Sequence, residues 1–328
     1  EIAREALKLI DVKYTVGKGI YDPFEALKED TPQINKFASD ELPKNVADTF
    51  HYEHGNIQEQ IDRSACIVSK TYRLPRVTHC CLGTSAITAD FNSTDGRLTL
   101  YSLTQVPFLY QRDMARILKM EPSKIRIIQP VIGGGFGSKL DMYPYEPIAA
   151  FLTMKCNRPV QIVFSREEEF IASPTRQAMT IELTTGSNKD GKFTFREVKI
   201  TKDNGAYTSW GATTSFVMMQ TFSSLYQVPA CLFDAQAVYT NNVYAGSFRG
   251  YGNPQATFAL ERNIDLMAEK LGIYKTDIRL LNANYQGEKT GQELVYNTCG
   301  MKDALQNVVS KSGYHNDKDS NSNGSRYK

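Results

Sequence analysis

A glycine-rich loop is the feature of this 328-residue chain whose residue types and spacing most clearly allow chemistry. Residues 133–139 read Gly-Gly-Gly-Phe-Gly-Ser-Lys and follow the largely apolar run 125–132. Glycine has no Cβ, so its backbone can adopt positive φ angles and a ligand can come close to the N–H groups. A loop of this kind after a strand is suited to hold an anion or an oxo group.

Two common phosphate-binding motifs do not fit this loop. The dinucleotide fingerprint needs a third glycine or alanine where the chain has Ser138, and Pro144 interrupts the helix that should follow. The P-loop needs a lysine followed by Ser or Thr, whereas Lys139 precedes Leu140. A tight structural turn stays open as the alternative for this loop taken alone.

A second glycine–aromatic loop, residues 247–255, reads Ser-Phe-Arg-Gly-Tyr-Gly-Asn-Pro-Gln. Asn253 and Pro254 suit the N-cap and first turn of a predicted helix, whose unpaired N–H groups favour an oxyanion. Arg249 adds a planar guanidinium that can donate two parallel hydrogen bonds. Tyr251 can present its ring to a planar substrate.

Gln105 is a third polar point, at the end of a predicted strand and just before Pro107 starts a helix. Taken singly, these residues have structural alternatives, because Gln105 can cap that helix and Tyr251 can belong to the core. Taken together with the two loops, they favour a binding site.

The elements that must position these residues alternate between strands and helices. Two hairpins are predicted, because strand-like runs flank glycine-containing turns at 92–96 and 186–191. The pattern indicates an α+β (mixed α/β) class, with mixed sheets, hairpins and packed helices. Strands are predicted at 87–91, 97–102, 125–132, 159–164, 179–184 and 192–201, and helices start at 107, 145, 253 and near 276.

Composition narrows the function classes. The formal net charge is only +2 and no basic patch interleaves with aromatic residues, which argues against a nucleic-acid partner. No apolar run is long enough for a membrane span and no signal peptide is evident. Scattered cysteines without metal-ligand spacing indicate a reducing, cytoplasmic location. The adjacent Cys80 and Cys81 are interpreted as buried small side chains, with a redox pair as the alternative.

At these residues the chain resembles the molybdopterin-binding subunit of the xanthine dehydrogenase (molybdenum hydroxylase) family, most of all the split-subunit nicotinate dehydrogenase type. Five motifs in the same order carry the resemblance, which covers about residues 1–284. They are Thr104-Gln105, Gly-Gly-Gly-Phe-Gly at 133–137, Asp-Asn-Gly-Ala-Tyr at 203–207, Tyr-Thr-Asn-Asn at 239–242 and Phe-Arg-Gly-Tyr-Gly-Asn-Pro-Gln at 248–255.

The resemblance implies roles for individual residues. Tyr251 and Leu140 would face the substrate. The molybdenum would be held by the pterin dithiolene, so no side chain of this chain is expected to ligate the metal. The residues expected to contact the cofactor are Gln105, Gly135, Phe136, Gly137 and Arg249.

The resemblance also implies the reaction. The family hydroxylates a carbon beside a ring nitrogen or in an aldehyde, with water as the oxygen source. Its catalytic glutamate lies in a second molybdopterin domain, before which this sequence ends, and Gly287-Glu288 stands at the wrong place. No catalytic residue is therefore expected in this chain, and the glutamate is expected on a partner chain.

Substrate and partners follow as expectations from the same resemblance. Leu140 and the lack of any arginine between Thr201 and Tyr239, where xanthine-oxidising relatives carry polar partners, argue against xanthine itself. An N-heteroaromatic substrate, nicotinate- or purine-like, is expected. Alternatives are an aldehyde- or aromatic-oxidising enzyme, a non-catalytic scaffold subunit, or a nucleotide-binding dehydrogenase. The cofactor is expected as the cytosine dinucleotide form, with 2Fe-2S clusters and FAD on partner subunits.

Three segments are predicted along the chain. Residues 1–60 form a connecting and wrapping segment. Residues 61–309 form the molybdopterin-binding domain, which corresponds to the first half of the family's molybdenum subunit. Residues 310–328 form a polar tail that is predicted to be disordered, because it lacks apolar periodicity.

Overall fold

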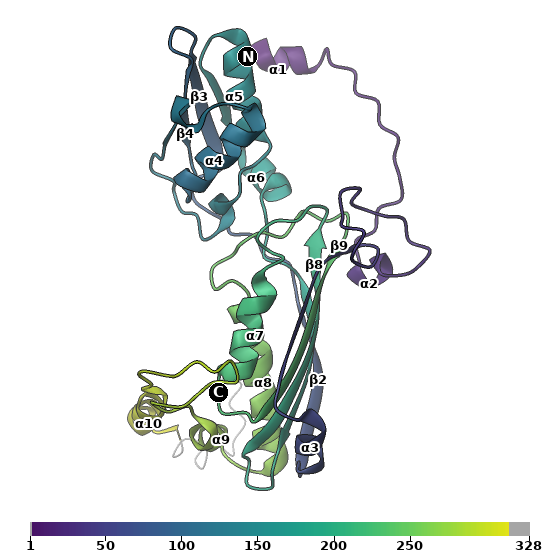
Figure 1. Cartoon of the computed structure of the whole chain (residues 1–328), viewed down its shortest axis with the longest axis vertical. Helices are drawn as coiled ribbons and strands as arrows, with labels where there is room; N and C mark the ends of the chain where they lie inside the picture. The colour runs from purple at the N-terminus through teal and green to yellow at the C-terminus, as the bar shows by residue number, and fades with distance from the viewer. Residues whose placement is uncertain (1, 315–328) are drawn as a thin grey trace.

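Two lobes, each built on its own sheet, stand end to end in the computed structural model, which describes residues 2–314 (Figure 1). The upper lobe has four strands in the order β5-β4-β3-β6, and the lower lobe has five in the order β1-β9-β8-β7-β2. Both sheets mix parallel and antiparallel pairs. The predicted mixed α and β class with hairpins is confirmed.

The upper lobe starts with a hairpin of β3 (Ala86–Asn92) and β4 (Arg97–Ser102). Helices α4 (Pro107–Leu118) and α5 (Tyr145–Cys156) contact each other and the strands, and with the sheet they bury Leu98, Leu100 and Met114. Apolar residues at helical spacing in α4 and alternating ones in β4 meet in this core. The remaining elements are β5 (Ile125–Ile128), β6 (Val160–Val163), α6 (Arg166–Ala172), η1 (Pro122–Lys124) and η2 (Ser138–Leu140).

The parallel pairing of β4 with β5 decides where the candidate site lies. Leu98 pairs with Ile125 and Tyr101 with Ile128, so both strands end at the same edge of the sheet. Gln105 follows β4 and the glycine loop follows β5. Side chains after parallel neighbouring strands converge at that edge, as ligand-binding residues commonly do in such sheets.

The lower lobe is a long sheet with two helices on one face (Figure 1). Helices α7 (Thr214–Ser224) and α8 (Asn253–Leu271) bury an apolar core against it that includes Phe222, Phe233 and Leu260. The strands are β1 (Val46–His54), β2 (Cys66–Leu74), β7 (Met179–Ser187), β8 (Phe193–Gly205) and β9 (Ala230–Tyr239), and α9 (Lys275–Asn282) follows α8.

The N-terminal segment does more than connect and wrap. After α1 (Ile2–Leu7) and α2 (Pro23–Ala26), it supplies β1, which pairs antiparallel with β9 at the edge of the lower sheet, and then α3 (Ile57–Asp62). The sequence prediction for residues 1–60 missed this strand because its partner lies about 180 residues away and its own apolar pattern is weak.

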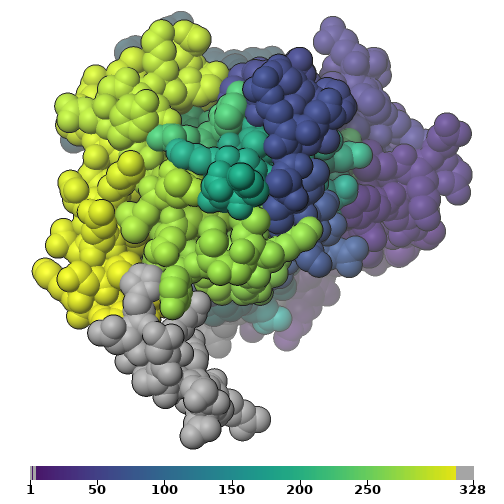
Figure 2. Space-filling view, turned by 90° about the horizontal axis from the view of Figure 1, so that it is seen from below, coloured from purple at the N-terminus to yellow at the C-terminus, as the bar shows by residue number. Residues whose placement is uncertain are grey.

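Helix α10 (Met301–Ser312) corrects the predicted start of the tail. Three residues of the segment 310–328 belong to this helix, and residues 315–328 lie outside the described part of the chain. Figure 2 shows the C-terminal residues, in yellow, on the opposite side of the molecule from the N-terminal residues in purple.

A buried carboxylate ties together the segments that pass between the lobes. Asp203, at the end of β8, pairs with Arg76 at 2.6 Å and accepts hydrogen bonds from Thr240 and Asn242 at 2.6 and 2.7 Å. The Gly205 N–H adds a fourth bond at 3.0 Å. Two of the five sequence motifs, at 203–207 and 239–242, therefore meet in one structural network.

Removing this carboxylate should destabilise the fold. Asp203→Ala leaves the mostly buried Arg76 guanidinium without its counter-ion, so the free energy of unfolding should drop by about 3 kcal/mol. Urea denaturation followed by circular dichroism measures it. Lys18→Ala, which removes the exposed ion pair of Lys18 with Glu25, is the matched control and should leave stability nearly unchanged. Equal effects of the two changes would contradict this account of the network.

Candidate functional site

The side-chain amide of Gln105 holds the glycine loop. Its Oε1 accepts hydrogen bonds from the N–H groups of Gly137 and Lys139, at 3.1 and 3.3 Å. The Gln105 N–H donates in turn to the Lys139 carbonyl at 2.8 Å. Because Oε1 is engaged with two donors, the Nε2 group is left to donate elsewhere, and no residue from 2 to 314 accepts from it.

Glycine is required where the loop passes Gln105. A Cβ on Gly135 would lie 2.4 Å from Gln105 Oε1, and a Cβ on Gly137 would lie 2.6 Å from the carbonyl oxygen of Ser247. Phe136, between them, has φ of 53° and an exposed ring. A non-glycine residue in the left-handed region is uncommon and often marks a functional site. The loop therefore presents Phe136 outward from a tightly fitted backbone.

The Lys139 side chain links the glycine loop to neighbouring backbone. Its side chain is buried, and Nζ donates to the carbonyls of Gly83 and Ile132 at 2.9 and 2.5 Å. Burial lowers the pKa of this ammonium group. Cys81 is buried and donates to the Gly135 carbonyl, whereas Cys80 is exposed, so the prediction of two buried thiols is wrong for Cys80.

The second predicted loop lies directly against the first. The Arg249 N–H donates to the Phe136 carbonyl at 2.9 Å, so the two loops share a backbone hydrogen bond. The Arg249 side chain is exposed and forms no ion pair with any residue between 2 and 314. The structure thus brings together all five predicted cofactor residues: Gln105, Gly135, Phe136, Gly137 and Arg249.

Two residues that the sequence analysis missed hold this second loop. The Arg176 guanidinium stacks 3.9 Å from the ring centre of Phe248 and donates to the Arg249 carbonyl at 2.7 Å. The His79 ring stacks on the Phe248 ring, with ring centres 4.2 Å apart, and its Nε2 forms a hydrogen bond with the Ser247 carbonyl. Neither residue belongs to a local motif, so no sequence signal identified it.

An apolar cavity of about 640 Å³ adjoins the loops. Tyr251 and Leu140, the two predicted substrate residues, both line it. The Tyr251 hydroxyl donates to the Trp210 carbonyl at 2.8 Å and bonds the Thr213 hydroxyl, which orients the ring. Partial burial raises the pKa of this phenol. The other lining residues are Val106, Leu109, Trp210, Thr213, Phe216, Val217 and Ser247, none of them charged.

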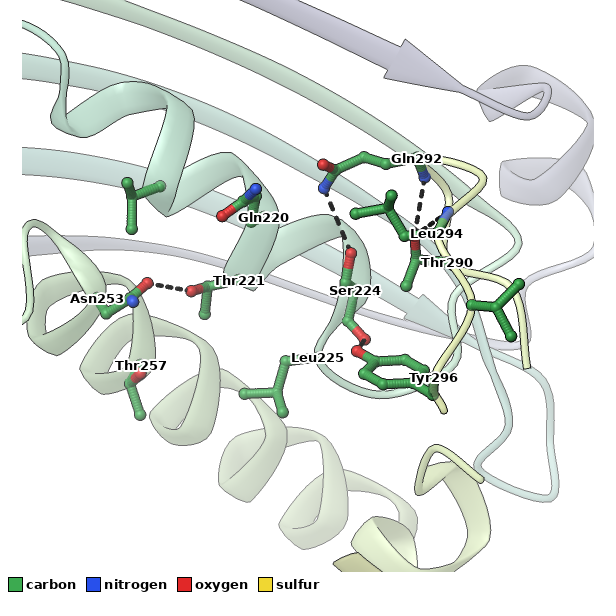
Figure 3. Close-up of a pocket in the computed structure, with 12 residues that line it drawn as sticks. Gln220, Thr221, Ser224, Leu225, Asn253, Thr257, Thr290, Gln292, Leu294 and Tyr296 are labelled. Carbon is green, nitrogen blue, oxygen red and sulfur yellow. Dashed lines mark hydrogen bonds between the residues drawn. The ribbon is translucent and has the colours of Figure 1, made fainter. Parts of the chain in front are cut away.

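A second cavity, of about 560 Å³, lies between α7, α8 and the 290–296 loop (Figure 3). Thr221 of α7 bonds Asn253 of α8 along its wall, and Gln292 of the loop donates to Ser224. Val217 borders both cavities, so α7 separates them. This second cavity contains none of the residues predicted for the site.

Three further predictions concern Glu288, metal-binding clusters of side chains and membrane-spanning helices. Glu288 accepts hydrogen bonds from Asn284 and Tyr285 and does not line the apolar cavity. Within residues 2–314, no group of three His, Cys, Asp or Glu side chains is arranged to hold a metal ion. No helix in that range has the length and apolar character needed to cross a membrane.

A buried carboxyl group supports the strand that carries Gln105. Glu146 of α5 accepts from the Ser102 hydroxyl at 2.6 Å and from the Tyr143 N–H at 2.8 Å. These bonds connect the end of β4 to the segment that follows the glycine loop. Burial raises the pKa of Glu146 to about 7, although the hydrogen bonds oppose the shift.

Comparison with known proteins gives a consistent match. The molybdopterin cofactor-binding domain family matches residues 38–283. The large molybdopterin subunit of nicotinate dehydrogenase from Eubacterium barkeri is 35% identical over 313 residues, which are 95% of this chain and 72% of that subunit. A putative xanthine dehydrogenase molybdenum-binding subunit from Escherichia coli K12 is 34% identical, over 93% of this chain and 40% of that one. The resemblance predicted from the five motifs is confirmed.

Solved structures agree on the fold. Aldehyde oxidoreductase from Desulfovibrio gigas superposes with a TM-score of 0.91 at 22% identity, over 98% of this chain and 35% of that one. Quinoline 2-oxidoreductase from Pseudomonas putida 86 superposes with a TM-score of 0.89 at 25% identity, over 97% of this chain and 41% of that one. The chain therefore spans well under half the length of these structural relatives.

Glu146→Gln should remove a pH dependence of stability. The folded chain binds the carboxyl proton more tightly than the unfolded chain, whose pKa is near 4.5. The stabilisation is therefore complete below pH 4.5 and is lost as the pH rises through about 7. The free energy of unfolding of the native chain, minus that of Glu146→Gln, should fall on the order of 3 kcal/mol over this interval. Urea titrations at several pH values measure the difference, and a constant difference would contradict the raised pKa.

Proposed function

The chain belongs to the molybdopterin cofactor-binding domain family, and we propose that it is the molybdenum-cofactor-binding subunit of a multi-subunit hydroxylase. The proposed reaction is hydroxylation of an N-heteroaromatic substrate, with water as the oxygen source. The observation that carries this proposal is the convergence of Gln105, the glycine loop and the Arg249 loop beside one apolar cavity.

The residues at this place fit a pterin-bound oxo-metal group. Gln105 offers an amide N–H₂ whose oxygen is already occupied, so it is poised to donate to an oxo ligand. The absence of a Cβ at Gly135 and Gly137 keeps the loop close to Gln105, with Phe136 outward. Arg249 offers an exposed guanidinium suited to the cofactor's polar groups. When bound, the molybdenum supplies an activated water-derived oxygen and accepts two electrons.

The protein's own contribution is to bind and orient the substrate. The cavity wall is apolar, and the Tyr251 ring is fixed by its two hydroxyl contacts. Leu140 continues the apolar wall directly after the glycine loop. A flat, neutral ring suits such a wall, because stacking needs no charge partner and water is excluded from the ring faces. A carboxylate such as nicotinate would need a cation from outside these lining residues.

One feature of the cavity supports a partner chain. No carboxylate lines the cavity among residues 2–314, so we propose that the catalytic glutamate comes from a second molybdopterin-domain chain. We further propose an iron–sulfur subunit, an FAD subunit, a cytosine dinucleotide form of the cofactor and a cytoplasmic location.

A second candidate function is a non-catalytic scaffold in the same kind of complex. The observation that favours it is again the cavity wall without a carboxylate. An aldehyde- or aromatic-oxidising enzyme is a variant of the first candidate, because the apolar wall also suits an aromatic aldehyde. A glutamate of the partner chain adjacent to Gln105 would favour catalysis over scaffolding.

The proposal predicts that the purified complex contains molybdenum in proportion to this chain. Metal analysis by plasma mass spectrometry, with pterin fluorescence after denaturation, measures both parts of the cofactor. A complex that contains neither molybdenum nor pterin would overturn the proposed function.

Gln105→Ala should lower turnover about 10- to 100-fold, which corresponds to the loss of one hydrogen bond to a charged group. Gly135→Ala should act similarly, because the new Cβ would displace the Gln105 amide. Gly300→Ala is the matched control, since a Cβ there meets no atom within 4 Å. Steady-state turnover and thermal unfolding are measured together. Full turnover in Gln105→Ala would exclude Gln105 from the site.

A further inference from the structure

The turn at residues 209–214 forms much of the apolar cavity's wall. It carries Trp210 and Thr213, and both contact the Tyr251 hydroxyl through the bonds already described. Trp210, Thr213 and Tyr251 are therefore one connected unit, here called the aromatic wall. A shift of the turn would move the rings of both Trp210 and Tyr251.

Lys202 supports this turn from beneath. Its side chain, on β8, is only 1% exposed. Nζ donates to the carbonyls of Gly211 and Ala212 and to the Thr214 hydroxyl, which accepts at 3.2 Å. All three donor hydrogens of the ammonium group are thus directed at three residues of one turn, Gly211, Ala212 and Thr214.

Stability alone does not explain a lysine here. No carboxylate within residues 2–314 forms an ion pair with Lys202, and Asp48 acts on it only over a longer distance. Burial lowers the pKa of this ammonium to about 7. An unpaired buried charge is destabilising, and an apolar side chain of similar volume is often tolerated as well or better. We therefore attribute the presence of a lysine here to the geometry that its three hydrogen bonds impose on the turn.

Two other side chains, Gln177 and Ser209, also hold this turn. Gln177 donates to the Gly211 carbonyl at 3.0 Å and to the Thr214 hydroxyl at 2.8 Å. At the start of the turn, Ser209 donates to Asp141 at 2.6 Å. The turn is therefore held at both ends, and Lys202 adds the hydrogen bond to the Ala212 carbonyl in its middle.

We propose that Lys202 is a positioning residue that fixes the aromatic wall and so sets which planar rings the cavity accepts. The ligand class is a neutral mono- or bicyclic heteroaromatic ring, held between aromatic and aliphatic side chains. The link to substrate choice rests on the proposed function, whereas the positioning of Trp210 does not.

The chain contains a built-in probe of this wall, because Trp210 is its only tryptophan. In the purified full chain, Lys202→Met should shift the Trp210 emission to longer wavelength and raise its acrylamide quenching constant by about 1.5-fold, since the turn loosens. Lys270→Met is the matched control: Lys270 is an exposed lysine on α8 that donates to the Ile67 carbonyl, and its loss should change neither quantity.

Titration with pyridine and quinoline, followed by quenching of Trp210 fluorescence, tests the fit of the ring. Lys202→Met should bind quinoline about tenfold more weakly than the native chain does and should lose the discrimination between the two rings. Lys202→Gln keeps a shorter hydrogen-bond donor, so its affinity for quinoline should lie between that of the native chain and that of Lys202→Met. The same variant replaces Lys202→Met in the test if Lys202→Met fails to fold. If neither pyridine nor quinoline binds the native chain, the acrylamide quenching constants of Trp210 decide whether Lys202 positions the aromatic wall.

The outcomes separate this proposal from the proposed function. Unchanged emission, quenching and ring affinity in a folded Lys202 variant would overturn the positioning role, even if the complex contains molybdenum. A lower melting temperature with unchanged Trp210 properties would also overturn it, because Lys202 would then serve stability alone. Looser Trp210 in a complex without molybdenum would support positioning while overturning the proposed function.

Discussion

The candidate site depends on two hydrogen bonds, which the side-chain amide oxygen of Gln105 accepts from N–H groups of the glycine loop. They form because β4 and β5 are parallel neighbours, so that Gln105 and the loop leave the sheet at one edge. They also require glycine at position 135, where a Cβ would collide with the amide. The same bonds orient the free Nε2 group. Strand pairing, the loop sequence and the orientation of the Gln105 amide thus depend on one another.

The second constraint is that the two lobes meet at this edge. The loop before α8 bonds to the glycine loop through Arg249 and Phe136, and Arg176 stacks on Phe248 to hold it there. The buried Asp203 network fixes the segments that pass between the lobes. The five motifs therefore divide by role: three form the site, and two, at 203–207 and 239–242, hold its frame.

Local signals predicted the helices that start at Pro107, Tyr145 and Asn253, because capping, proline and apolar spacing act within a few residues. The glycine loops and Gln105 were also visible, since their residue types suggest close backbone approach. Strand β1 was not, because its stability comes from pairing with distant β9. Arg176 and Lys202 were missed for a related reason: a single charged residue in a strand or loop gives no sign of burial until the tertiary fold supplies its partners.

The central claim is that Gln105, the glycine loop and Arg249 surround a molybdenum cofactor. Anomalous diffraction at the molybdenum edge, from crystals of the purified complex, tests it most directly. The account predicts one strong anomalous peak beside Gln105 and Phe136, next to the cavity lined by Tyr251. A molybdenum peak elsewhere in the complex, with ordinary solvent at Gln105, would contradict it.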